Sequence, residues 1–157
     1  GSTDYPTMGT YSGVGDGYAS FANAMLAANS TGTNGLIRHE AGGHAFGRLG
    51  DEYSVSWYTE ALVNERHNVG FYRNVATNQS YWSAFTAAGY GSDEVMYDKY
   101  GPYTTYRSTR ESGIMWNNNG QFNAVSRHAI YERIIKQSQG AGAYSWNSFL
   151  EWDKKNR

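Results

Sequence analysis

Residues 39–51 read HEAGGHAFGRLGD and contain two histidines, His39 and His44, that stand five positions apart. In the common H-E-x-x-H pattern the separation is four, which places both imidazoles on one helix face to bind zinc. A separation of five rotates the second side chain by roughly 140°, so a regular helix would not bring the rings together. One extra residue absorbed in a π-bulge would do so, and the adjacent glycines of the motif permit it. We therefore predict a widened turn at residues 41–43, with imidazole nitrogens about 3 to 4 Å apart.

A helix is expected to carry this motif. Asn34 can cap its start, Leu36 and Ile37 supply apolar residues, and Gly47 marks its end. Each of the two adjacent glycines inside it costs about 1 kcal/mol relative to alanine, so the pair indicates a close approach or an irregular turn.

The residues around the histidines supply candidates for the rest of a zinc site. Glu40 follows the first histidine and would be aimed at water bound to the metal. Residues 44–47 resemble the H-x-x-G step by which metzincin zinc peptidases turn the chain sharply and bring a third ligand back to the metal. At the common spacing this ligand would be residue 50, which is a glycine. Asp51 is the nearest group able to bind and Glu52 is the next, so the spacing leaves both open.

A second signature is SGIM at residues 112–115, in a turn-rich context, and its Met115 stands 64 residues after Asp51. It is similar to the Met-turn, the methionine-bearing turn that lies under the zinc ligands of metzincin peptidases. A lone methionine is more often part of a core. The position of Met115, after the histidine helix and before a closing helix, favours the Met-turn.

The closing helix is predicted from apolar residues at helical spacing. They are Phe122, Val125, Ala129, Ile130 and Ile134. Asn123 can cap the start of this helix and Gly140 its end.

Four runs together carry a family resemblance: HEAGGHAFGRLGDEY (39–53), NVATNQSYW (74–82), TYRSTRESGIM (105–115) and FNAVSRHAIYERI (122–134). They resemble the immunoglobulin A peptidase-like family of metzincin zinc endopeptidases. The resemblance covers roughly residues 35–136, and its first run is highly specific.

The resemblance implies a role for each motif residue. His39, His44 and Asp51 would be the ligands of Zn²⁺, and Glu40 would be the general base. Met115 would be the Met-turn residue. The extra glycine relative to H-E-x-x-H is a departure from the common metzincin spacing.

The resemblance also implies a fold. A metzincin catalytic domain builds a twisted, mostly parallel sheet before its zinc helix, but only 38 residues precede His39. Such a sheet needs roughly 100 residues. We therefore expect residues 1–157 to be a single α+β, metzincin-like catalytic domain, in its C-terminal part, with an incomplete N-terminal sheet. The expected order is a zinc-site helix, a loop-rich middle over residues 51–110, the Met-turn and the closing helix. Little activity is expected from this chain alone.

The composition narrows the functional classes. The chain has 13 basic and 14 acidic residues and no run of 18 apolar residues, which predicts neither a nucleic-acid interface nor a membrane span. It has no cysteine, so a metal must be bound by His, Asp or Glu. Its 14 tyrosines, 5 tryptophans and 19 glycines indicate an aromatic-rich, loop-rich fold of a kind common in secreted proteins.

Five further residues are expected to have structural roles, and three of them have a functional alternative. His67 is expected in a solvated loop, and His128 is expected to be a hydrogen-bonded core or surface histidine. Tyr53 is expected to pack in the core, with a hydroxyl for a substrate carbonyl as the alternative. Arg107 and Arg110 are expected to form structural pairs, with a substrate carboxylate as the alternative partner.

The leading interpretation is a zinc-dependent endopeptidase, secreted, periplasmic or on the cell surface, that hydrolyses peptide bonds of extracellular proteins or glycoproteins. The alternative is a non-catalytic carbohydrate- or glycoprotein-binding module, whose tyrosines and tryptophans stack on sugars and whose zinc is structural or absent. Glu40 separates the two, because a structural zinc site has four protein ligands and no base, whereas a catalytic site has three ligands and an open position.

Overall fold

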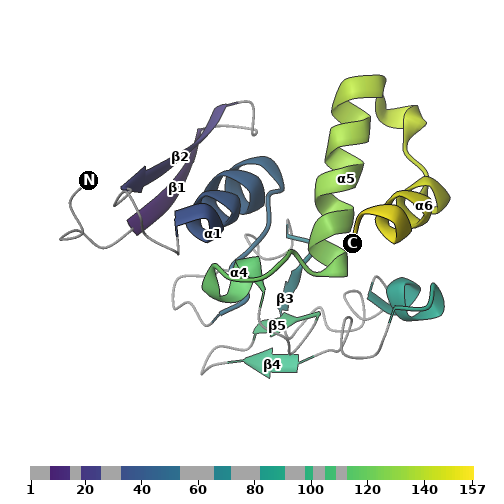
Figure 1. The fold of residues 1–157 in the computed structure, drawn as a ribbon, viewed down its shortest axis with the longest axis horizontal. Coiled ribbons are helices and arrows are strands. Elements are labelled where there is room, and N and C mark those ends of the chain that lie inside the picture. The colour runs from purple at the N-terminus through teal and green to yellow at the C-terminus, as the bar shows by residue number, and fades with distance from the viewer. Residues whose placement is uncertain are drawn as a thin grey trace.

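The computed structural model describes residues 8–14, 19–25, 33–53, 66–71, 82–90, 98–100, 105–108 and 113–157. In chain order the elements are β1 (Met8–Val14), β2 (Ala19–Met25), α1 (Thr33–Ile37), η1 (Arg38–Phe46), β3 (Val69–Phe71), β4 (Asp98–Tyr100), β5 (Thr105–Arg107), α4 (Ile114–Asn117), α5 (Ala124–Gln139), η3 (Ala141–Ala143) and α6 (Trp146–Asn156). A further helical stretch spans 82–87. Figure 1 shows α1 and η1 forming one continuous helix beside β1 and β2.

The strands form two small sheets. β1 pairs with β2 in an antiparallel register that sets Met8 opposite Met25. The second sheet has the order β3-β5-β4, and both of its pairings are antiparallel. The described part of the chain therefore contains helices and short antiparallel sheets, and the metzincin-like α+β architecture stays a prediction. None of the described helices is both long and apolar enough to cross a membrane.

The motif helix contains the widened turn that the histidine spacing predicts. η1 is a π-helix over Arg38–Phe46, which is longer than the predicted turn at 41–43, and it ends at Gly47 as expected. The helix begins at Thr33, so the prediction that Asn34 caps it is wrong. Local sequence fixes a helix end only to within a residue or two, because threonine and asparagine both occur readily around a helix start.

The predicted closing helix is α5, and its caps are confirmed. The Asn123 side chain accepts a hydrogen bond from the Ser126 amide at 2.9 Å, and Gly140 ends the helix with a φ of +92°. Its predicted apolar face is only partly buried. α6 packs against the side of α5 that carries Tyr131, and Ile134 stays 44% exposed.

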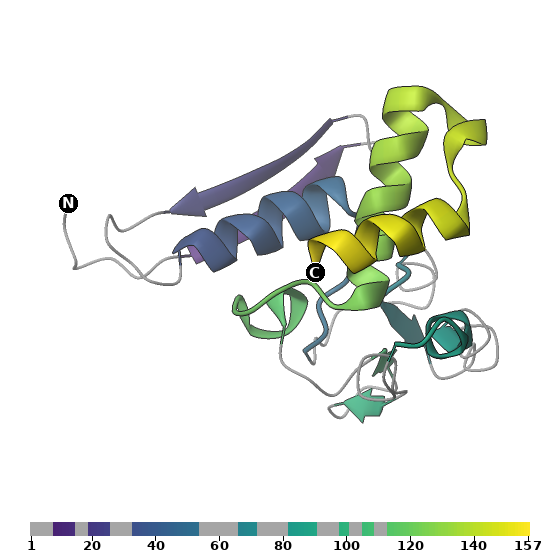
Figure 2. The same cartoon turned by 45° about the vertical axis from the view of Figure 1, so that its right-hand side comes forward.

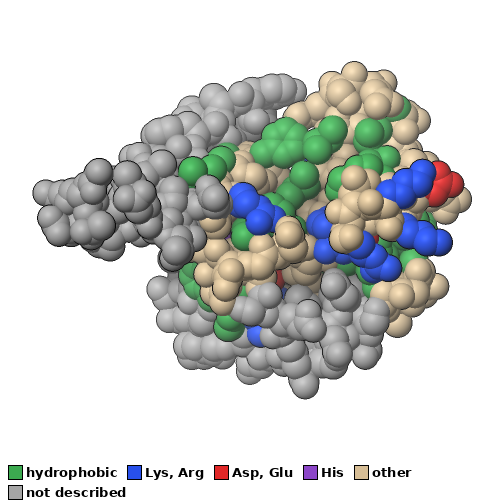
Figure 3. Space-filling model, viewed as in Figure 1, with side chains coloured by type: hydrophobic (Ala, Val, Ile, Leu, Met, Phe, Trp, Pro, Cys, Tyr) green, Lys and Arg blue, Asp and Glu red, His purple; other side chains and the backbone are tan. Residues whose placement is uncertain are grey.

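α5 is not the last helix, because α6 follows it, and the expectation of a single closing helix is wrong. The Ser145 hydroxyl caps α6 by accepting from the Ser148 amide at 3.1 Å. Lys154 and Lys155 lie in its last turn, where they complement the helix dipole. Figure 3 shows Lys and Arg side chains gathered on this part of the surface. Phe149 is fully buried and fixes α6 across α5 (Figure 2).

His128 lies inside an aromatic cluster. It is 4% exposed, and its ring contacts Phe85, Trp146 and Phe149. Its Nε2 atom shares a hydrogen bond with the hydroxyl of Tyr144. The prediction of a hydrogen-bonded core histidine is therefore confirmed.

The burial of His128 predicts a loss of stability in acid. Burial lowers the pKa of His128 to about 4, from 6.5 in an unfolded chain. Between these values the unfolded chain binds a proton that the folded protein does not, so the folded state loses about 3 kcal/mol as the pH falls from 6.5 to 4. Urea titrations of the metal-free protein should show this decline in the free energy of unfolding. The His128→Gln variant should decline less steeply, and equal slopes in the two proteins would contradict the prediction.

Candidate metal centre

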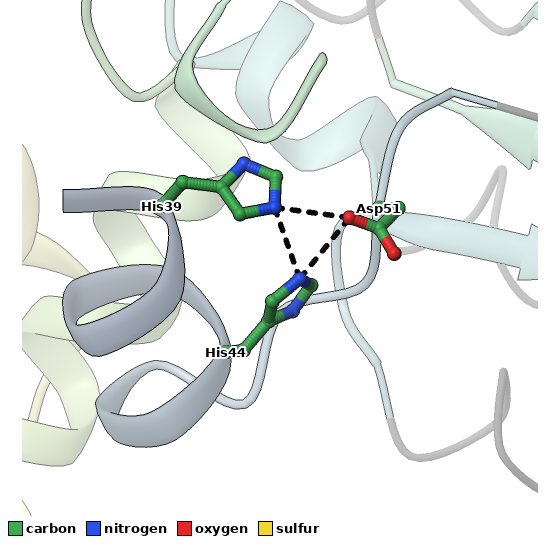
Figure 4. Close-up of side chains that lie close together, drawn as sticks. All are labelled: His39, His44 and Asp51. Atoms are coloured by element: carbon green, nitrogen blue, oxygen red, sulfur yellow. Dashed lines mark hydrogen bonds and ion pairs between the residues drawn. The ribbon is translucent and has the colours of Figure 1, made fainter. Parts of the chain in front are cut away.

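Three side chains from η1 and the loop after it converge on one point (Figure 4). Nε2 of His39 and Nε2 of His44 lie 3.0 Å apart. Oδ1 of Asp51 lies 3.0 Å from the first nitrogen and 3.1 Å from the second. The prediction that the extra residue brings both imidazoles together is confirmed, and the three residues form a group that could hold a metal ion.

Each imidazole is fixed through its other nitrogen. Nδ1 of His39 donates to the carbonyl oxygen of Ile114 at 2.7 Å, and Nδ1 of His44 donates to that of Leu49 at 2.8 Å. A carbonyl oxygen only accepts, so in the neutral ring Nε2 presents a lone pair to the centre of the cluster. Two nitrogens and a carboxylate oxygen then face one another as acceptors. A cation between them would satisfy all three.

The charges in the cluster also favour a cation. Burial opposes ionisation of Asp51, but the hydrogen bonds that His39 and His44 donate to it when their Nε2 atoms are protonated hold the pKa of this carboxyl well below its usual range. Burial likewise opposes the charge on His39, yet the hydrogen bonds with Asp51 and Ile114 raise its pKa. A metal ion competes with a proton for this site, so its binding weakens as the pH falls.

A tight turn after η1 returns the chain to the histidines. The Gly47 amide donates to the carbonyl oxygen of Gly42 at 2.9 Å. A Cβ atom at position 47 would lie 2.9 Å from Cγ1 of Ile130, so only glycine fits between the turn and α5. Arg48 adopts a left-handed φ of 52°, and Asp51 follows three residues later. The H-x-x-G step thus brings Asp51 back to the cluster.

Met115 lies directly under η1. It is 1% exposed, and a Cβ atom at Gly43 would lie 2.2 Å from its sulfur. The carbonyl of its neighbour Ile114 holds His39. Met115 therefore packs against the zinc-motif helix, and the contact explains why a glycine stands inside this helix. Its identity as a Met-turn methionine stays a prediction. Ser112 lies outside the described residues.

Glu40 is placed beside the cluster and not within it. The side chain is 7% exposed, and its negative charge is close enough to raise the pKa of His39. Within the described part of the chain its Oε2 atom is buried and has no hydrogen-bond partner. In a regular helix Glu40 and His44 would share a face. The π-helix pairs His39 with His44 instead and leaves Glu40 beside the cluster.

Asp51 and Glu52, the two candidates for a third ligand, lie in different surroundings. The Glu52 side chain is 1% exposed, and its Oε1 accepts hydrogen bonds from Asn68 at 3.0 Å and Asn123 at 2.8 Å. Burial raises its pKa, although these amides oppose the shift. Glu52 is therefore part of a buried hydrogen-bond network, and Asp51 is the carboxylate of the cluster.

The other residues singled out from the sequence, Tyr53, Arg107 and His67, differ in their burial and contacts. The prediction that Tyr53 packs in the core is wrong, because it is 39% exposed with its ring stacked on that of His39 at 6.3 Å. Arg107 is buried, and its guanidinium lies 3.7 Å from the ring centre of Trp116 in a cation–π contact. His67 lies exposed in a bend before β3, as predicted.

Arg110 lies outside the described residues. Sequence reasoning missed Asn68, which is fully buried and bonded to the loop that carries Asp51. An asparagine in the polar run 64–68 gives no local signal of such a contact. Only its place immediately before a strand could have drawn attention to it.

Neither protein-family models nor curated proteins give a match to this chain. The family resemblance therefore stays a prediction based on its motifs.

Proposed function

We propose that this chain carries the catalytic centre of a zinc-dependent endopeptidase. The observation that supports the proposal is the convergence of three acceptor atoms from His39, His44 and Asp51 within 3.1 Å of one another. A tetrahedral zinc ion with three protein ligands has one open position, as catalytic sites do, whereas structural sites use four ligands. The described residues offer no fourth His or carboxylate to this group. This favours catalysis over a binding module with structural zinc.

The donor set fits zinc in type and spacing. Two imidazole nitrogens and one carboxylate oxygen are ligands that zinc prefers, with bond lengths of about 2.0 to 2.2 Å. Tetrahedral ligands at these lengths lie roughly 3.3 Å apart. The atoms here are 3.0 to 3.1 Å apart, so a small outward movement would admit the ion.

The proton transfers are assigned to Glu40. When bound, zinc supplies Lewis-acid chemistry that makes water a nucleophile near neutral pH. The Glu40 carboxylate takes a proton from the attacking water and delivers it to the nitrogen of the leaving amine. Its buried Oε2, which accepts no hydrogen bond from the described residues, has the capacity for that proton. The substrate is a protein or peptide outside the cell, and the protein acts as a secreted, periplasmic or cell-surface enzyme.

The proposal predicts one zinc ion per chain and peptide hydrolysis that depends on it. We expect equilibrium dialysis with elemental analysis to give a stoichiometry near one, and a strong chelator to reduce it to zero. Cleavage of an unfolded protein such as casein should stop with the chelator and return with added zinc, however low the rate of this chain alone. A chain that binds no zinc at neutral pH would refute the proposal.

A further inference from the structure

The loop formed by residues 50–52 carries Asp51 and is held on one side by a single amide. The Gly50 amide donates to Oδ1 of Asn68 at 2.8 Å, and Nδ2 of Asn68 donates to the Gly50 carbonyl at 2.7 Å. Both polar groups of this glycine are thus bound by one fully buried side chain. Asn68 immediately precedes β3, which pairs with β5, so the amide is attached to a sheet.

The orientation of the Asn68 amide is fixed by Glu52. Nδ2 of Asn68 donates to Oε1 of Glu52 at 3.0 Å, and the same oxygen accepts from Nδ2 of Asn123 at 2.8 Å. Asn123 also caps α5 through its other amide atom. The three side chains therefore join the loop 50–52 to β3 and to the start of α5.

The other side of the loop is held by the Met-turn. The Glu52 amide donates to the carbonyl oxygen of Met115 at 2.8 Å. Asp51 therefore stands between two residues whose backbones are both fixed. This explains how its Oδ1 atom is held at nearly equal distances from His39 and His44.

We infer that Asn68 is a positioning residue that sets the metal affinity of this site by fixing the loop 50–52. The inference rests on the proposed metal site. A loop held before the ion arrives loses little conformational freedom on binding, whereas a released loop must be ordered by the ion itself. Groups that orient metal ligands typically change affinity about 10- to 100-fold when altered.

The test is Asn68→Asp, which keeps the size and the acceptor oxygen but removes both donated hydrogen bonds. Zinc dissociation constants are measured by competition with a chromophoric chelator, and the unfolding temperature is measured without metal. We expect Asn68→Asp to weaken zinc binding about 10- to 100-fold. The added negative charge alone would strengthen binding, so it cannot produce this result. In Asn68→Asp combined with Glu52→Gln, the new amide can donate to the new carboxylate, and part of the affinity should return.

Tyr90→Phe is the matched control. It removes a buried hydrogen bond to Asp153, 2.6 Å long, that does not touch the metal cluster. It should lower the unfolding temperature but change the zinc affinity by less than about twofold, because distant sites act independently. An unchanged zinc affinity in Asn68→Asp, or an equal loss in Tyr90→Phe, would overturn the inference.

Crystal structures of the metal-free proteins separate this inference from the proposed function. If the natural chain binds no zinc, the proposed function fails. The position of Asp51 then decides the inference by itself. A displaced Asp51 carboxylate in Asn68→Asp supports the positioning role, and an unmoved one refutes it.

Discussion

Glu40→Gln is expected to reduce peptide hydrolysis by about 10²- to 10⁴-fold while zinc stays bound. An amide has nearly the shape of a carboxylate but cannot take a proton from water. Glu40 is outside the ligand group of His39, His44 and Asp51, so its replacement leaves the metal ligands intact. The measurement combines initial rates on a quenched fluorescent peptide with the zinc content of the same sample.

Glu151→Gln is the control for this substitution, since Glu151 lies exposed on α6. It should retain the full rate. If Glu40→Gln also retained the rate, Glu40 would not be the base. If it lost zinc together with activity, Glu40 would be a ligand and the assignment of Asp51 would need revision.

Asp51→Asn is expected to weaken zinc binding by more than about 100-fold, because one of three ligands that together contribute roughly 10 kcal/mol loses its charge. Glu52→Gln makes the same chemical change one residue later. It should have little effect, because the amide oxygen can still accept from Asn68 and Asn123. Competition titrations with zinc on both variants measure the difference.

Comparing the zinc affinities of Asp51→Asn and Glu52→Gln shows which carboxylate binds the ion. If Glu52→Gln lost zinc and Asp51→Asn retained it, Glu52 would be the ligand and Asp51 would not. Asp51→Ala should remove binding altogether, and retention of one zinc ion in that variant would refute the assignment. Circular dichroism of each variant shows whether a loss comes from unfolding.

The sequence predicts those parts of the site that depend on local backbone geometry. The five-residue separation of His39 and His44 requires a widened helix, and η1 is one. The Asn123 cap and the Gly140 end of α5 follow from side-chain chemistry within a few residues. These features are predictable because their causes lie close together in the chain.

The parts that could not be predicted depend on contacts between distant segments. Asn68 acts on a loop 18 residues earlier, and nothing near it in the chain indicates that contact. Tyr53 stacks on the ring of His39 and stays 39% exposed, and only the returning loop places it there. Ile134 continues the apolar face of α5 but is left uncovered because α6 packs on another side. The sequence also could not predict that Asp51, and not Glu52, lies in the histidine cluster. That difference depends on the distant residues that bind each carboxylate, such as Asn68 and Asn123 for Glu52.

The hydrogen bonds that hold the metal ligands have a consequence for how the chain folds. The bond from His39 to Ile114 joins residues 75 positions apart, and the bond from Asn123 to Glu52 joins residues 71 apart. Such long-range contacts form slowly, since the entropy of closing a long loop is lost before the contact stabilises it. The cluster is therefore complete only after η1, the loop 50–52, α4 and α5 have assembled. An ion bound here would stabilise the finished fold by mass action and would not nucleate it.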